Sequence, residues 1–193
     1  MKYLKMLGLA AVAAMAFTAF AASSASATTL EVGGVTQAGS VTIKATAEQS
    51  ISLARTDGSF ANTCTESEVE GATTIKTGAA VTGPISKLTF NKCTFGVEVV
   101  DPGKLEIVHI AGTTDGTVYS ENATVRTGSV FGNLHCVTGD TTHIGTLTGV
   151  DGTPATFATM HISAVLNCGF LVPSATWKGS YTVTSPHNLG VSA

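Results

Sequence analysis

Two cysteine-ended segments constrain the fold of this chain more than any other feature. Residues 85–95 read ISKLTFNKCTF, and residues 162–170 read ISAVLNCGF. Both begin with Ile-Ser, continue through branched apolar residues, and close on Asn, Cys and Phe. This echo predicts two related halves, about residues 41–100 and 104–184, each with its own pair of cysteines.

The first 27 residues have the features of a secretory signal peptide. Lys2 and Lys5 precede an alanine-rich apolar run, and residues 25–27 (Ala-Ser-Ala) fit the small-x-small cleavage pattern. A retained membrane anchor is the alternative, but a spanning helix needs roughly twenty apolar residues and this run barely reaches that length. We therefore expect cleavage after Ala27, no membrane span after processing, and a secreted product that comprises residues 28–193.

The cysteines are predicted to form two disulfides. An even cysteine count behind a signal peptide favours disulfides over thiolate metal ligands, and the sequence has no C-x2-C pair. Four cysteines allow three pairings. The echo favours Cys64–Cys93 and Cys136–Cys168 over the crossed alternatives. Each bond would close a loop of about thirty residues, which stabilises a fold by roughly 3–4 kcal/mol in the chain-entropy model.

Composition narrows the class of protein. Residues 28–193 have a size typical of one domain. Only 12% of the whole chain is charged, about half the usual share, and its formal net charge is −3. An acidic chain with few, scattered basic residues is not suited to nucleic acid or to anionic membrane surfaces. A surface rich in Thr and Ser instead suits a protein that works outside the cell.

Alternation of apolar and polar residues predicts the fold class. Along residues 158–166 every second side chain is apolar, and residues 175–184 place Trp177 and Tyr181 on one face. No stretch after residue 27 sustains a helical period, and turn signals recur between the alternating segments. We expect an all-β, antiparallel β-sandwich of the jelly-roll or immunoglobulin-like type in one domain, with two small β units as the alternative. The acidic stretch 64–71 is predicted to be a loop.

Histidines offer two candidate groups. The dipeptide His-Ile occurs at His109, His143 and His161, which could line up on neighbouring strands and bind a transition metal. His135 and Asp140 form a second loose group with His143. Neither group has the spacing of a metal motif, so solvent-facing or core histidines are the preferred interpretation, and no metal site is predicted.

Acidic and nucleophilic residues likewise give no catalytic motif. Glu66, Glu68 and Glu70 would share one side of an extended chain and offer oxygen ligands to Ca²⁺, but they lack the Asp/Gly pattern of calcium loops. The chain has no Gly-x-Ser-x-Gly sequence, and no feature selects a carboxylate pair for glycosidase chemistry. Asn122 begins an Asn-Ala-Thr glycosylation acceptor, a frequent chance match. We predict no catalytic residue and no cofactor.

Four segments together carry a resemblance: MKYLKMLGLAAVAAMA, GAAVTGPISKLTFNKC, GTLTGVDGTPAT and ATWKGSYTVTSPHNLGV. The chain resembles a set of uncharacterised exported β-rich proteins from high-GC Gram-positive bacteria. That resemblance implies export and brings no activity with it.

The expected function is therefore non-enzymatic. The leading hypothesis is an extracellular or cell-surface β-protein with a structural or interaction role, whose partner is the extracellular matrix, the cell surface or another copy of itself. The alternative is an extracellular module that binds a small apolar or carbohydrate ligand. The two differ in whether aromatic side chains such as Trp177, Tyr181, Phe157 and Tyr119 lie in the core or on the surface.

Overall fold

The computed structural model describes residues 27–57, 61–129, 132–150, 156–170 and 172–193. Apart from Ala27, the predicted signal peptide lies outside these residues. The described residues contain strands and no helix, which confirms the predicted all-β class. The strands are β1 (Thr28–Val32), β2 (Val35–Thr36), β3 (Thr42–Ala47), β4 (Ile51–Arg55), β5 (Ala61–Ala72), β6 (Thr77–Gly78), β7 (Val81–Cys93), β8 (Val97–Asp101), β9 (Lys104–His109), β10 (Gly116–Glu121), β11 (Thr124–Ser129), β12 (Gly132–Val137), β13 (Thr142–Thr148), β14 (Thr159–Leu166), β15 (Ala175–Ser185) and β16 (Leu189–Ser192).

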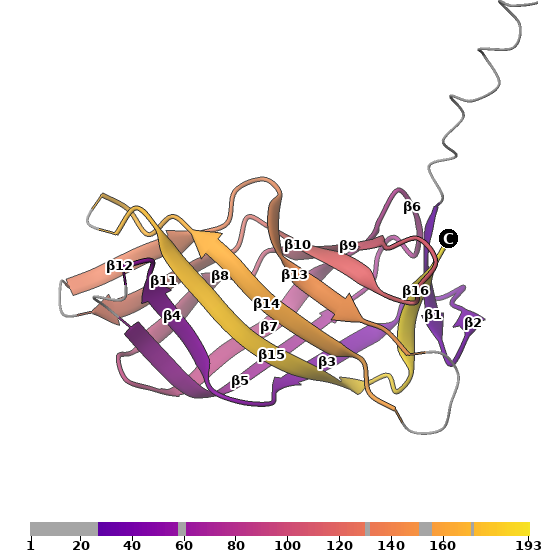
Figure 1. Cartoon of the computed structure of the whole chain (residues 1–193), viewed down its shortest axis with the longest axis horizontal. Coiled ribbons are helices and arrows are strands. Elements are labelled where there is room, and N and C mark those ends of the chain that lie inside the picture. Colours follow the sequence, from indigo (N-terminus) through magenta and orange to yellow (C-terminus); the bar gives the residue numbers. More distant parts are fainter. Residues whose placement is uncertain (1–26, 58–60, 130–131, 151–155, 171) are drawn as a thin grey trace, which may run out of the picture.

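The largest sheet closes on itself instead of packing against a second sheet. Around it, β3, β5, β7, β9, β10, β13, β14 and β15 are neighbours in chain order, and β15 pairs back to β3 (Figure 1). This closed, eight-stranded antiparallel barrel differs from the predicted sandwich. The physical reason is that β15 is hydrogen-bonded on both sides, to β14 and to β3 and β4, so the sheet keeps no free edge there.

Several barrel strands are interrupted midway, and their second parts extend the wall. β3 and β4 both lie between β5 and β15. β8 leads into β9, β10 into β11, and β12 into β13, while β8, β11 and β12 form a three-stranded sheet of their own. Gly103 marks one interruption: its φ is +69°, and a Cβ there would lie 2.2 Å from the carbonyl oxygen of Glu121. Another interruption lies at Asn122, whose φ is 56°.

A small sheet made from both ends of the described chain covers one end of the barrel. β1 pairs with β16, β2 and β6 (Figure 1). Leu30 and Val191 in this terminal sheet have 0% exposure, and both belong to the hydrophobic core. The Thr28 hydroxyl accepts a hydrogen bond from the His109 backbone N–H at 3.0 Å, which ties the terminal sheet to β9.

Both predicted disulfides are present, and both lie towards the other end of the barrel. Cys64 on β5 is bonded to Cys93, directly opposite on β7. Cys136 on β12 is bonded to Cys168, just beyond β14. The described residues thus contain no free cysteine. The two bonds lie four barrel strands apart, whereas the division into halves at about 41–100 and 104–184, and the assignment of 28–193 to one domain, stay predictions.

One predicted loop is a strand. The acidic stretch 64–71 lies within β5, where its glutamates face outwards from the barrel. Among the residues that the structure describes, no helix is long and apolar enough to cross a membrane.

Candidate binding cavity

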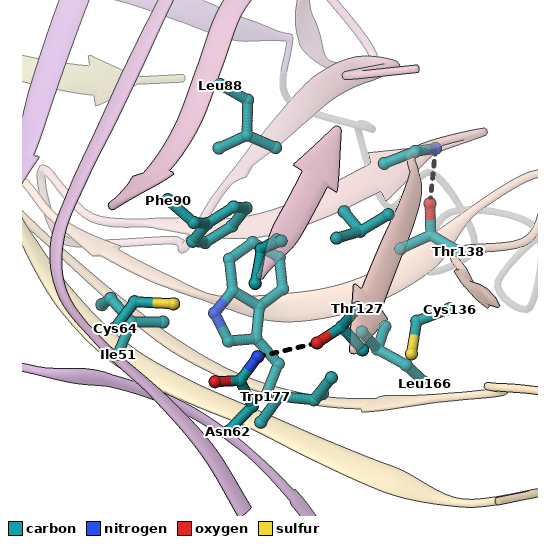
Figure 2. Close-up of a pocket in the computed structure, with 14 residues that line it drawn as sticks. Ile51, Asn62, Cys64, Leu88, Phe90, Thr127, Cys136, Thr138, Leu166 and Trp177 are labelled. Carbon is teal, nitrogen blue, oxygen red and sulfur yellow. Dashed lines mark hydrogen bonds between the residues drawn. The ribbon is translucent and has the colours of Figure 1, made fainter. Parts of the chain in front are cut away.

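A cavity of about 50 Å³ lies inside the barrel at the end that carries the disulfides. Its wall comes from β4, β5, β7, β8, β11, β12, β14 and β15 and from the turns beside them. Apolar side chains dominate the lining, among them Ile51, Leu53, Leu88, Phe90, Val97 and Val125 (Figure 2). A void of this kind stays dry unless polar groups are present to hold water.

Trp177 occupies the centre of this cavity wall. It lies on β15, where alternation turns its side chain inwards, and its ring meets that of Phe90 edge-on with centroids 5.7 Å apart. In Figure 2 the indole nitrogen lies on the side of Cys64 and Ile51. The nitrogen is buried, and its N–H has no hydrogen-bond partner. An unpaired buried donor costs about 1–3 kcal/mol.

Other polar side chains of the lining are satisfied within the protein. The Asn62 amide donates to Thr127 Oγ1 at 2.7 Å and to the Phe95 carbonyl at 3.0 Å, and its oxygen accepts from the Phe95 N–H. The Thr138 hydroxyl accepts from the Ala123 N–H at 2.8 Å (Figure 2). Among the described cavity residues, the Trp177 indole N–H is therefore the buried side-chain donor left without a partner.

A seam in the wall runs beside the cavity. β7 pairs with β9 only from Val81 to Pro84, and in the part of the chain that the structure describes no ladder joins the rest of β7 to β8. Leu88 and Phe90 on one side of the seam and Val97 on the other line the cavity. Beyond Pro84 the Ile85 N–H still donates to the Gly103 carbonyl at 3.0 Å, and past that bond the two sides of the seam present apolar side chains to the cavity.

The middle of the barrel contains a buried polar pair. The Tyr181 hydroxyl lies 2.9 Å from Ser67 Oγ, and Ser67 itself donates to the Thr89 carbonyl at 2.7 Å. Tyr181 has 0% exposure. Burial raises the pKa of the Tyr181 phenol to about 12, and the hydrogen bond with Ser67 lowers it by a smaller amount. Tyr181 is thus a neutral core residue at physiological pH.

The predicted histidine groups are not assembled into a metal site. His109 Nε2 lies 2.8 Å from the Thr113 carbonyl, His161 Nδ1 lies 2.9 Å from Ser180 Oγ, and the His143 ring packs against Tyr119. No three His, Cys, Asp or Glu side chains among the described residues are grouped so that they could hold a metal ion.

The second loose histidine group is also dispersed. His135 accepts a hydrogen bond from Arg126 Nε at 2.9 Å, and Arg126 also forms an ion pair with Glu98 at 3.0 Å. Asp140 is exposed in the turn between β12 and β13. The structure therefore ties His135 to an arginine on the neighbouring strand instead of to Asp140 or His143.

The three alternating glutamates are each paired with a lysine. Glu70 lies 3.0 Å from Lys44, Glu68 pairs with Lys87, and Glu66 pairs with Lys92. The hydrogen bond with Glu68 raises the pKa of Lys87, the largest of several influences on it. These carboxylates thus form a row of surface ion pairs across neighbouring strands and do not converge on a shared site.

Sequence reasoning placed Trp177 and Tyr181 on an inward face, and the structure confirms both. It missed Asn62 and the free indole N–H. The signal that pointed to Trp177 is a lone tryptophan on the apolar face of a strand, whereas nothing in the sequence marks Asn62. Phe157 is 45% exposed and lies beside the ring of His187, so the aromatic residues divide between the core and the surface.

Comparisons of the chain with protein-family models, with curated proteins and with solved structures find no match.

Proposed function

We propose that the protein is an exported, non-enzymatic binding protein that holds a small apolar ligand inside its barrel, with a hydrogen-bond acceptor of the ligand against Trp177. The observation that carries this proposal is the buried indole N–H of Trp177, which has no partner in the protein and belongs to a side chain that lines an apolar cavity. A carbonyl or ether oxygen is the group that such a donor lacks. Eight-stranded barrels are wide enough to enclose one small ligand.

Export rests on the predicted signal peptide and on the disulfides. Disulfides persist in oxidising compartments and are rare where thiols are kept reduced. Both bonds flank the cavity, since Cys64 and Cys136 line it. A binding module that works outside the cell is consistent with a wall held by covalent cross-links.

The test uses a matched pair of ligands with the purified protein. 2-Hexanone carries a carbonyl acceptor, and 2-methyl-1-hexene has the same shape with a methylene group in its place. Trp177 is the chain's one tryptophan, so its emission reports on this cavity alone. We expect both ligands to change the emission of Trp177, and calorimetry to give their affinities.

Trp177→Phe supplies the control for the hydrogen bond. The variant removes the donor, so the affinity of the ketone should fall by about two- to tenfold relative to that of the alkene, the range expected for one net hydrogen bond. The ratio of the two affinities cancels the effect that the smaller phenylalanine ring has on the binding of both ligands. Equal losses for the two ligands would contradict the proposed role of Trp177, and absence of binding by either would contradict the function.

A structural or interaction role on the outer surface is the second candidate. Phe170, next to the Cys136–Cys168 bond, is 98% exposed, and Val165 on the outer face of β14 is 62% exposed. A contiguous apolar patch marks a contact surface, so this candidate requires Phe170 and Val165 to belong to one such patch. Sedimentation of the intact protein and of Phe170→Ser tests self-association: a concentration-dependent dimer that the substitution abolishes would favour this candidate.

A further inference from the structure

The interior holds three voids that follow one another along the barrel axis. The cavity beside Trp177 is the first, a void of about 20 Å³ is the second, and one of about 70 Å³ next to the terminal sheet is the third. Their order follows β5, where Cys64 lines the first, Val69 the second and Ala72 the third. The voids therefore lie in a row instead of forming one rounded chamber.

Few side chains separate neighbouring voids. The first and second voids share the lining residues Leu88, Ala123 and Trp177, and the second and third share Val69, Ile85, Leu105 and Met160. Methionine has three rotatable bonds and a polarisable sulfur, so it adapts readily to a new neighbour. Rotation of such side chains can join the voids without any change in the strand pairing that holds the wall.

From this arrangement we infer the class of ligand: an unbranched aliphatic chain with a terminal acceptor, its polar end at Trp177 and its tail along the barrel axis towards Leu189. This inference rests on the proposed function. A compact ring system of equal size would have to push strands apart, whereas a chain needs only new rotamers. The third void is lined almost entirely by apolar groups and is bounded by Leu189 of the terminal sheet.

The length of the chain follows from the strand geometry. Trp177 lines the first void and Val183 the last, and both lie on β15. At about 3.3 Å per residue and a tilt of about 40°, that segment spans roughly 15 Å of the axis, the length of an extended chain of about twelve carbons. The voids of about 50, 20 and 70 Å³ are smaller than such a chain, so the side chains between them must move to admit it. Affinity should rise about fourfold per added methylene up to that length and then stop rising.

The experiment measures affinity against chain length and shape. A series of 2-alkanones from about six to about fourteen carbons is titrated into the intact protein, with Trp177 emission and calorimetry as readouts. 2-Adamantanone, a compact ketone with the same carbon number as 2-decanone, is the matched control for shape. We expect 2-decanone to bind at least tenfold more tightly than the compact ketone.

Substitutions in the third void, with a control on the outer face, test where the tail of the ligand lies. Ala45 is 2% exposed and lines the third void, so Ala45→Leu should fill it and shift the optimal chain length down by several carbons. Ala54→Leu, on the outer face of β4, leaves the voids untouched and should keep the optimum unchanged. If Ala45→Leu does not fold, Val183→Ile adds one methyl group to the same void and should shorten the optimum slightly.

The outcomes separate this inference from the proposed function. Binding of 2-adamantanone as tight as that of 2-decanone, or an optimum that Ala45→Leu does not move, would overturn the chain-shaped ligand while leaving binding beside Trp177 intact. Absence of any effect of either ketone on Trp177 emission and heat would overturn the proposed function and, with it, this inference.

Discussion

The two ends of the barrel are closed in different ways. At one end, the terminal sheet lays Leu30 and Val191 over the interior, both at 0% exposure. At the other end, two disulfides join neighbouring wall strands, while inward-facing side chains such as Leu53 and Phe90 remain half-buried. Packing against the chain's own termini thus closes one end, whereas covalent bonds hold the wall of the other, where inward-facing side chains keep part of their surface exposed.

One of the largest expected effects comes from removing the Cys136–Cys168 disulfide, because few other interactions join the strands that it connects. β12 and the end of β14 are joined by the isolated bridge between Val137 and Asn167, besides the Cys136–Cys168 bond. Replacing both cysteines by alanine should lower the free energy of unfolding by about 3–4 kcal/mol in urea denaturation.

The other disulfide serves as the matched comparison. Cys64 and Cys93 lie within the continuous ladder of β5 and β7, which persists when the bond is absent. The double alanine variant of this pair should lose less stability than the Cys136–Cys168 variant. An equal or larger loss would show that the ladder contributes nothing to holding that end.

Truncating one apolar side chain at each end of the barrel should show how much side-chain packing contributes to stability at that end. Leu30→Ala removes a fully buried side chain at the terminal sheet and should cost about 2–5 kcal/mol of stability. Leu53→Ala, at the disulfide end, removes a half-buried side chain beside a void and should cost about 1 kcal/mol. Thermal unfolding of both variants checks this ranking, and equal losses would contradict the contrast between the ends.

The middle of the barrel should respond to alkaline pH. Burial raises the pKa of Tyr181 to about 12, above its ordinary value of 10.0. The folded state therefore binds the proton more tightly than the unfolded state, so this contribution to stability is complete below pH 10 and is lost as the pH rises towards 12. The loss should reach roughly 2–3 kcal/mol.

Urea denaturation across this alkaline range, with tyrosinate absorbance as a second readout, measures the effect. Tyr181→Phe should remove this part of the pH dependence, since Ser67 keeps its hydrogen bond to the Thr89 carbonyl. A variant that loses stability above pH 10 as steeply as the wild-type protein would contradict the assignment to Tyr181.

The smallest effect is expected on the outer face, away from both ends. Lys44 and Glu70 form a partly exposed ion pair with a separation of 3.0 Å. Exposed pairs contribute little because water screens them, so Lys44→Gln should change the free energy of unfolding by less than about 0.5 kcal/mol. A loss above about 1 kcal/mol in urea would show that the row of ion pairs on β5 acts as a network.

The alternation of apolar and polar residues predicted the individual strands better than it predicted that the sheet closes into a barrel. The alternation along 158–166 placed Met160, Ile162 and Leu166 inside, as found. The echo between the segments predicted both disulfide pairings. Closure into a barrel depends on β15 pairing with β3 and β4, which lie far away in the chain, and alternation within one strand carries no information about which strand lies next to it.

The error over residues 64–71 has a local cause. Cys64 and Ser67 are both buried although they lie three residues apart. The inward-facing positions of β5 therefore change from even-numbered to odd-numbered residues between them. With three glutamates outside and a serine inside, the stretch lacks the apolar alternation by which strands are predicted. The free indole N–H of Trp177 was also beyond prediction, because it depends on the positions of side chains from other strands.

The most direct test of the binding cavity is the nuclear magnetic resonance signal of the Trp177 indole N–H in ¹⁵N-labelled protein, a single resonance in this chain. Saturation with 2-decanone should move that resonance downfield as the carbonyl accepts its hydrogen bond, whereas an unbranched hydrocarbon of similar length should produce no such downfield shift. An indole signal that stays in place with the ketone at saturation would contradict the account.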